Sequence, residues 1–274
     1  MFWNDLLRIL NTQMTVPTSF GWFHILFFAA SIAVGIVLCI VCKDRERYAR
    51  PILLITAVTV IVLEVYKLIN FGYGTSYETE LTYDFPWYAF PWQFCSTPMY
   101  VGLLAALTRG KVHRSLCAYL ATFAVFAGLC VMIYPGDVFM GTVGINIQTM
   151  ICHGSMLTIG IYLLGTGYVP RAHKTILHAL PVFCATALVA IVLNEIAYRT
   201  GLLETDGFNM FYFSPHQEPH LPVFSDVQRA IGADNPLCML IYIAAFTLAA
   251  YLILLIAMGL GRLLTRKEKA EVTA

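Results

Sequence analysis

Long apolar stretches alternate with short polar segments over most of the chain. A window of about 19 residues finds seven such stretches, each close to the roughly 20 residues that a helix needs to span a bilayer. The predicted helices cover about 20–42, 50–71, 90–107, 113–134, 143–164, 175–198 and 236–264. The alternating strand pattern of an outer-membrane barrel is absent from the sequence. The sequence therefore predicts an all-α membrane protein with seven transmembrane helices.

The remaining segments complete the predicted organisation. Residues 1–19 place Phe2 and Trp3 on an apolar helical face opposite Asp5 and Arg8, which is typical of a short interfacial helix. The transmembrane domain then covers residues 20–264, and residues 265–274 form a basic tail. The connection at about 199–235 is rich in aromatic residues and proline, and loops of this length are commonly functional. We expect it to pack over the bundle.

Lys and Arg residues are distributed unevenly between the predicted loops. One side carries Lys43, Arg45, Arg47, Arg50, Arg109, Lys111, Arg114, Arg171, Lys174, Arg262, Arg266, Lys267 and Lys269. The other side has only Arg8, Arg199 and Arg229. Because basic loops stay in the cytoplasm, the pattern predicts an external N-terminus and a cytoplasmic C-terminus.

Composition supports the membrane prediction. Of 274 residues, 59% are hydrophobic and 12% are charged, far more apolar than a soluble domain needs. We therefore expect membrane lipids as partners and no nucleic acid, while the oligomeric state stays open. No N-x-Ser/Thr sequon occurs, which favours a bacterial cytoplasmic membrane.

The sequence contains no strong metal or disulfide pattern. Most of the eight cysteines lie inside predicted helices, which is not a disulfide framework. Cys39 and Cys42 form a C-x-x-C pair without a second pair, and a structural zinc site needs four ligands. His216 and His220 lack a carboxylate at ligand spacing. We predict neither a metal nor another cofactor.

Ionisable residues within the second predicted helix are more informative. Glu64, Lys67 and Asn70 follow one another at three-residue steps, so they share one face in its outer half. Charged groups in hydrocarbon are costly and usually face a bundle interior or a wet cavity. The group is either an ion pair that fixes helix packing or part of a site.

A polar stripe runs along the fifth predicted helix. Thr142, Asn146, Thr149 and His153 recur at helical period, and His153 lies about 15 Å below the outer helix end at 1.5 Å per residue. Asn194 lies at a similar level near the end of the sixth helix. The stripe indicates either a satisfied buried histidine or a site reached from the outer surface.

The stretch PWQFCSTPMY places Cys95 at the start of the third predicted helix. Pro91 suits a first helical turn, so we expect Cys95 about one turn inside the helix, where the dipole lowers a thiol pKa. Pro98 cannot donate to the carbonyl of Phe94, which would leave that acceptor unpaired. Cys95 is either an apolar filler or a reactive thiol.

Several of these stretches together resemble a known family. LEVYKLINF, PWQFCSTPMY, GLCVMIYPGD, MICHGSML, NEIAYRTGL and FNMFYFSP are similar, in order and spacing, to the YwaF-like bacterial integral membrane proteins. A more distant similarity is to the animal transmembrane acyltransferases that remodel ether phospholipids. The resemblance implies a cysteine nucleophile and a histidine, which correspond to Cys95 and His153. It also includes Asn209 in the last stretch.

Acyl transfer is the chemistry consistent with these residues. His153 would take the proton of Cys95, and the thiolate would attack a lipid ester to give a thioester. Gln93 and Asn194 are candidate donors to the oxyanion. The supporting residues that we predict are Glu64, Lys67, Gln93, Asn146, Asn194 and Asn209.

Other classes of protein stay open. An ion-coupled carrier would also place Glu64, Lys67 and His153 in a cavity, although no inverted repeat or broken helix is detectable in the sequence. A seven-helix receptor fits the topology. A retinal protein is disfavoured, because the last helix has no lysine between Pro236 and Gly261. A non-catalytic membrane protein would tolerate all of these residues.

Overall fold

The structure is a computed structural model that describes residues 2–136, 138–201, 207–217, 221 and 223–273, with side chains described as far as residue 263. The helices of this part are α1 (Phe2–Leu10), α2 (Trp22–Val41), α3 (Arg45–Tyr73), α4 (Thr97–Leu107), α5 (Gly110–Ala121), α6 (Phe123–Ile133), α7 (Val143–Gly165), α8 (Thr175–Thr200), α9 (Phe224–Ile231) and α10 (Pro236–Thr273). Short 3₁₀ turns are η1 (Ser76–Glu78), η2 (Trp87–Ala89) and η3 (Met210–Tyr212). The basic tail that we predicted continues α10.

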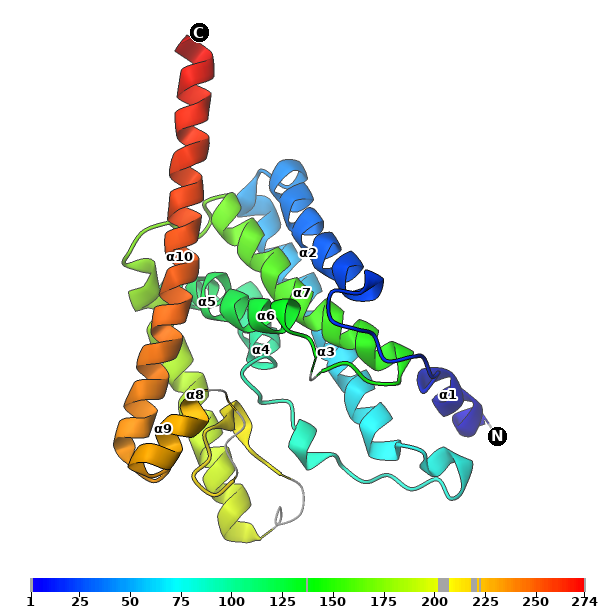
Figure 1. The fold of residues 1–274 in the computed structure, drawn as a ribbon. Helices are drawn as coiled ribbons and strands as arrows, with labels where there is room; N and C mark the ends of the chain where they lie inside the picture. Colours follow the sequence, from blue (N-terminus) through cyan, green and yellow to red (C-terminus); the bar gives the residue numbers. More distant parts are fainter. Residues whose placement is uncertain (1, 137, 202–206, 218–220, 222, 274) are drawn as a thin grey trace.

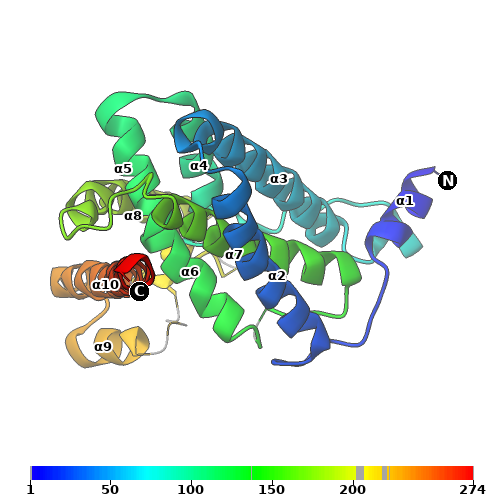
Figure 2. The ribbon, with the colours of Figure 1, turned by 90° about the horizontal axis from the view of Figure 1, so that it is seen from above.

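The helices form one bundle around α7. This helix packs against α2, α3, α5 and α6, while α8 and α10 complete the opposite side (Figures 1 and 2). Small residues let α2 approach α7 closely, because a Cβ on Gly35 would lie 2.9 Å from the Cβ of Ile161. The prediction of an all-α protein is confirmed.

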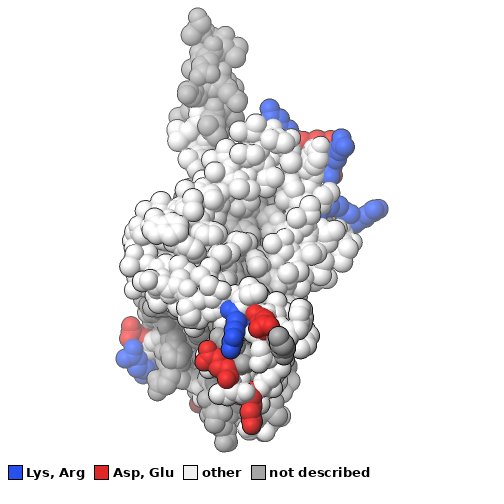
Figure 3. Space-filling model, turned by 90° about the vertical axis from the view of Figure 1, so that its right-hand side faces the viewer, with Lys and Arg blue, Asp and Glu red and all other residues white. Residues whose placement is uncertain are grey.

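The surface of the bundle is that of a membrane protein. Six stretches in the described part are long and apolar enough to cross a bilayer: Trp22–Val41, Arg45–Tyr73, Gly110–Ile133, Val143–Gly165, Thr175–Thr200 and Pro236–Leu263. Figure 3 shows a wide uncharged band between groups of charged side chains at the two ends. The chain is therefore an integral membrane protein.

The helix predicted at 90–107 is shorter than expected. Only Thr97–Leu107 is helical, and α4 runs antiparallel to the basic half of α3: Met99 clusters with Val60, and Arg50 donates to the Thr108 carbonyl at 2.6 Å. At 1.5 Å per residue these 11 residues cover about 16 Å, roughly half of a bilayer core. The prediction of a full-length helix is wrong because residues 91–96 form turns.

The stretch predicted as one helix at 113–134 is also interrupted. α5 ends at Ala121 and α6 begins at Phe123, with Thr122 outside helical geometry (φ −130°, ψ −76°). The Thr122 hydroxyl donates to the Ala118 carbonyl at 2.7 Å, a back-bond that bends helices. Tyr119, one turn before the break, hydrogen-bonds Thr97 at the start of α4 at 2.7 Å. Two helix interruptions thus meet at one depth inside the bundle.

Candidate functional site

Cys95 lies just before α4, where the chain changes from turns to helix. The backbone N–H groups of Ser96 and Thr97 both donate to the Gln93 carbonyl, at 2.8 and 3.1 Å. Pro98 occupies the first turn of α4, the place that we had predicted for Pro91. The prediction that Cys95 lies one turn inside a helix is therefore wrong; it precedes the helix by two residues.

The carbonyl beside the thiol has a partner. Thr97 Oγ1 donates to the Phe94 carbonyl at 2.9 Å and also meets Tyr119 Oη at 2.7 Å. We had predicted that Pro98 leaves this carbonyl unpaired. The side chain of Thr97 replaces the missing N–H, so the start of α4 offers no free acceptor at Phe94.

Two opposite charges act on Cys95. The residue is partly exposed, and Lys67 and Glu64 act on its thiol with opposite effects. Because Cys95 precedes α4, the dipole argument that assumed a position inside the helix does not apply to it. Burial raises the pKa of Tyr212 to about 12, and Cys95 adds to this, which places the thiol close to the 207–216 segment.

Glu64 and Lys67 form an ion pair on α3 that faces the same region. Lys67 Nζ lies 2.5 Å from Glu64 Oε1, and Glu64 is 5% exposed. Gln148 on α7 donates to Glu64 Oε2 at 3.4 Å and lies 3.4 Å from Cys152 Sγ. Neither Gln148 nor Cys152 is among the site residues predicted from the sequence. The i, i+4 spacing of these two α7 residues was the available signal.

Two asparagines that we predicted on polar helix faces, Asn70 and Asn146, hydrogen-bond other parts of the chain. Asn70 donates to the Leu10 carbonyl at 3.2 Å and to Asn11 Oδ1 at 2.9 Å, which ties α3 to the N-terminal segment. Asn146 binds both the N–H and the carbonyl of Met140, at 2.9 and 2.7 Å. Both asparagines hold the backbone of connecting segments, and neither joins Glu64.

His153 presents an unpartnered nitrogen inside the bundle. It is 8% exposed, and Nδ1 lies 2.8 Å from the Thr149 carbonyl, so Nδ1 is the protonated nitrogen of the neutral ring. Nε2 is buried and has no partner in the described part of the chain. The lone pair on Nε2 of this neutral ring is free to accept a proton.

No hydrogen bond joins Cys95 to His153 among the described residues. The cysteine–histidine contact found there is on α5, where Cys117 Sγ lies 3.5 Å from His113 Nε2. Both ring nitrogens of His113 are occupied, at 2.6 Å from the Ala105 carbonyl and 2.6 Å from Tyr168 Oη. This pair joins α4, α5 and the loop after α7. Neither ring nitrogen of His113 is free to act as a base.

The 207–216 segment inserts into the bundle beside Cys95. Met210 and Phe211 are fully buried, and Phe94 contacts Phe211 at 5.6 Å between ring centroids. Gln93 donates to the Asn209 carbonyl at 2.9 Å and accepts from Phe211 N–H at 3.0 Å. The predicted loop over the bundle is thus a packed segment in its described part.

Three predicted polar residues hold this segment. Asn194 binds Met210 through both groups of its amide, at 3.0 Å to the carbonyl and 2.8 Å from the N–H. Asn209 accepts from Ser214 N–H at 2.9 Å, and its Nδ2 is buried without a partner in the described residues. The side-chain amides of Gln93 and Asn194 therefore hydrogen-bond backbone groups of the 207–216 segment.

A second polar group lies at the C-terminal end of α8. Glu195 accepts from His216 Nε2 at 2.8 Å and from Arg199 Nε at 3.1 Å, while the His216 ring stacks on Tyr198. His220 lies outside the described residues. This group is separate from Glu64, Lys67 and Gln148.

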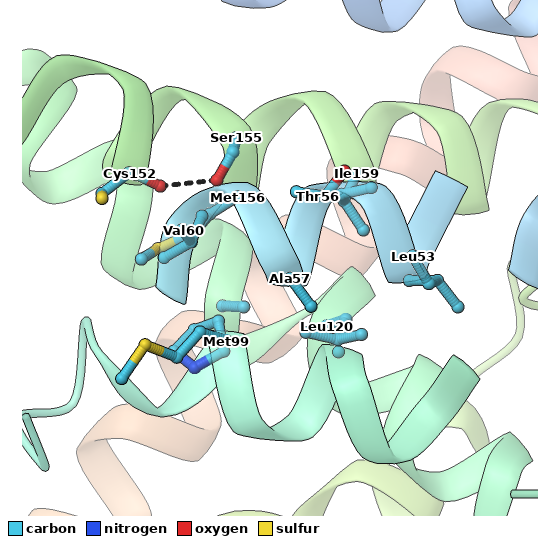
Figure 4. A pocket seen from close by; sticks show the side chains of 13 residues that line it. Leu53, Thr56, Ala57, Val60, Met99, Leu120, Cys152, Ser155, Met156 and Ile159 are labelled. Carbon is cyan, nitrogen blue, oxygen red and sulfur yellow. Dashed lines mark hydrogen bonds between the residues drawn. The ribbon is translucent and has the colours of Figure 1, made fainter. Parts of the chain in front are cut away.

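The bundle interior beside the site is closely packed. A cavity of about 30 Å³ lies between α3, α4 and α7, lined by Val60, Met99, Cys152 and Ser155 among others (Figure 4). Ser155 donates to the Cys152 carbonyl at 2.7 Å, so its hydroxyl is already used. A space of this size holds a water molecule or two and no lipid chain.

The fold and the site define a polytopic α-helical membrane protein with a buried polar cluster on α3 and α7. The chain belongs to the TMEM164 family, whose family model matches residues 19–260. Comparison with curated proteins and with solved structures gives no match.

Proposed function

We propose that the protein transfers acyl groups between membrane lipids through Cys95, with His153 as the base. The observation that carries the proposal is the unpartnered Nε2 of buried His153, in a bundle where Lys67 acts on both the imidazole and the thiol. A protonated, partly exposed thiol needs such a base to become a nucleophile.

The proposed reaction has two steps. His153 Nε2 takes the Cys95 proton, Sγ bonds to the ester carbonyl carbon, and the ester C–O bond breaks as His153 returns the proton to the leaving alcohol. The acyl thioester is then attacked by a lysolipid hydroxyl or by water, and the thiol is restored. Catalytic hydrogen bonds are often long without substrate, so Cys95 and His153 need not touch in the resting protein.

The remaining polar residues assist Cys95 and His153 through the places that they occupy in the bundle. Lys67 is a cation whose charge acts on the Cys95 thiol, and Glu64 forms an ion pair with Lys67. Gln148 fixes Glu64 from α7. Asn209 belongs to the 207–216 segment, and its Nδ2 is buried without a partner among the described residues, so it is the candidate oxyanion donor in place of Gln93 and Asn194.

Trapping the acyl-enzyme tests this function. The full chain in nanodiscs is incubated with alkyne-labelled phospholipids, and label is scored before and after hydroxylamine. We expect hydroxylamine-labile label on wild type and on Cys152→Ser, none on Cys95→Ser, and much less on His153→Gln. Label that persists in Cys95→Ser, or no label from any phospholipid class, would refute the proposal.

A carrier is the second candidate, and the two helix interruptions favour it. α4 begins and α5 ends at one depth inside the bundle, joined by the bond between Thr97 and Tyr119. Discontinuous helices at the membrane midplane are typical of secondary transporters. Substrate-dependent proton uptake in proteoliposomes that survives Cys95→Ser would support the carrier over the enzyme.

We also infer that the chain crosses the membrane seven times. α3 and the α5–α6 stretch both lead away from the basic end, so residues 74–109 must return through the bundle as turns followed by α4. The basic loops support an external N-terminus and a cytoplasmic C-terminus. A bacterial cytoplasmic membrane stays our prediction for the location.

A further inference from the structure

A second concave region lies on the membrane-facing surface, away from the cavity of Figure 4. It is a groove of about 450 Å³ between α4, α5 and α8. Its apolar lining includes Val101, Leu104, Val112, Leu116, Val182 and Val189. The volume falls within the roughly 300–1,000 Å³ of small-molecule sites. The groove is therefore large enough for a ligand.

At the end of this groove near the start of α4, the indole of Trp92 and the hydroxyls of Thr97 and Thr186 already have partners. Trp92 Nε1 donates to the Thr186 carbonyl at 3.1 Å, and Thr186 Oγ1 donates to the Phe183 carbonyl at 2.9 Å. The Thr97 hydroxyl is held by Tyr119 and by the Phe94 carbonyl. An occupant needs no hydrogen bonds to these three side chains, which suits a hydrocarbon chain at this end.

The groove has the length of one leaflet. It extends from Lys111, at the start of α5, to Trp92 and Thr97, at the start of α4. Because α4 covers about 16 Å, the groove extends through roughly half of a 30 Å hydrocarbon core. One acyl chain from the leaflet at the basic end would fill it.

The charge at one end of the groove indicates which kind of lipid head group would bind there. Lys111 is exposed, lines the groove at its basic end, and makes no ion pair within the described part of the chain. The other lining residues are uncharged. A lysine at a membrane surface attracts anionic head groups.

We propose that this groove binds one anionic phospholipid, with its phosphate at Lys111 and one acyl chain along α4 up to Trp92 and Thr97. In this orientation the chain end, and not the ester, comes nearest to Cys95. The bound lipid is therefore not the substrate of the proposed acyl transfer, and the proposal goes beyond that function.

Photo-crosslinking in nanodiscs tests the site. The full chain is reconstituted in phosphatidylcholine with a small fraction of phosphatidylglycerol that carries a diazirine either at the chain end or near the glycerol. We expect the chain-end probe to label peptides containing Trp92–Val101 and the glycerol probe to label residues 112–116. Labelling spread evenly over the exposed helices would show ordinary boundary lipid and overturn the proposal.

Two pairs of variants sharpen this test. Lys111→Gln should lower phosphatidylglycerol labelling about fivefold, whereas Lys174→Gln at the same end should not. Ala185→Trp, which fills the groove, should abolish chain-end labelling, whereas Leu188→Trp outside it should not. Equal labelling within either pair would overturn the proposal. Cys95→Ser should leave all labelling unchanged, so loss of acyl transfer and loss of lipid binding are separable.

Discussion

Cys95 is a thiol between opposite charges. The charge of Lys67 favours the thiolate, and the charge of Glu64 disfavours it. A thiol with an ordinary pKa of about 8.5 is mostly protonated at neutral pH, and its thiolate fraction grows as the pH rises. Reactivity at neutral pH then requires a base, and the free Nε2 of His153 is the base that the bundle supplies.

Removing the charge of Lys67 and removing the charge of Glu64 should shift the rate of Cys95 alkylation in opposite directions. Lys67→Met removes a stabilising charge and should slow labelling at pH 8, whereas Glu64→Gln should accelerate it, by about tenfold for each unit of pKa change. The measurement is the rate of iodoacetamide modification of Cys95 against pH, read by mass spectrometry.

A matched control is Lys111→Met, at the start of α5. This change should leave the pH dependence of the Cys95 alkylation rate unchanged. Shifts in the same direction for Lys67→Met and Glu64→Gln would mean that access, and not charge, governs the reaction.

The sequence could predict part of this residue-level picture. Glu64, Lys67 and His153 stood out because ionisable groups are rare in apolar helices. Gln148 did not, since an uncharged amide one residue from the Thr149 stripe is unremarkable until α7 is placed against α3. The partner of the Phe94 carbonyl was also hidden, because it depends on the rotamer of Thr97.

The helix pair α2 and α7 shows how single glycines determine packing. A Cβ on Gly35 would overlap Ile161 of α7, whereas a Cβ on Gly259 of α10 would meet nothing within 4 Å. Both glycines are helical, so they share the same backbone effect on substitution. The difference between them isolates the contact between helices.

Gly35→Ala should therefore destabilise the protein by about 1–3 kcal/mol relative to Gly259→Ala, because overpacking forces the two helices apart. The measurement is thermal unfolding of both variants in the same detergent. Equal midpoints would show that α2 and α7 adapt without cost.

The 207–216 segment is a second element whose contacts contribute to the stability of the protein. Gln93 and Asn194 each satisfy one buried N–H and one buried carbonyl of this segment. Gln93→Ala and Asn194→Ala should each destabilise the protein by about 1–3 kcal/mol for every group left unpaired.

The readouts are thermal unfolding and cleavage by an added protease, with Gln217→Ala as a control in the same connection. Stability equal to the control in both variants would show that water replaces the two amides.

Hydropathy could not locate the interruptions in the helices. The turns at 91–96 include Trp92, Phe94 and Cys95, and Thr122 is one polar residue among apolar ones, so a window average treats each stretch as continuous. The bend at Thr122 follows from a side-chain hydrogen bond, and the late start of α4 follows from Pro98. Both depend on local geometry that a 19-residue average removes.

The whole molecule has charged ends and an uncharged band, as expected for a membrane protein. Six helical stretches in the described part of the chain are long and apolar enough to cross a membrane, and in our proposal residues 74–109 supply a seventh crossing. The six stretches were predictable because each contains a long apolar window. The proposed seventh crossing is half coil, so no length criterion for helices would detect it.

Fusions of alkaline phosphatase and of green fluorescent protein after Gly74 and after Arg109 test this topology. Alkaline phosphatase needs disulfides and is active only outside the cytoplasm. We expect active phosphatase after Gly74 and fluorescence after Arg109. The same reporter active at both positions would contradict the crossing, and the reverse pattern would contradict the orientation.

The buried Phe211 has a consequence for the order of assembly. Its N–H is held by Gln93, from the first half of the chain, and its carbonyl by the Tyr242 hydroxyl of the last helix, at 3.0 Å. Phe211 and Tyr212 both adopt left-handed backbone angles, a conformation that persists only where neighbours impose it. During synthesis this segment therefore waits for α10, and the neighbourhood of Cys95 closes only after the final helix has left the ribosome.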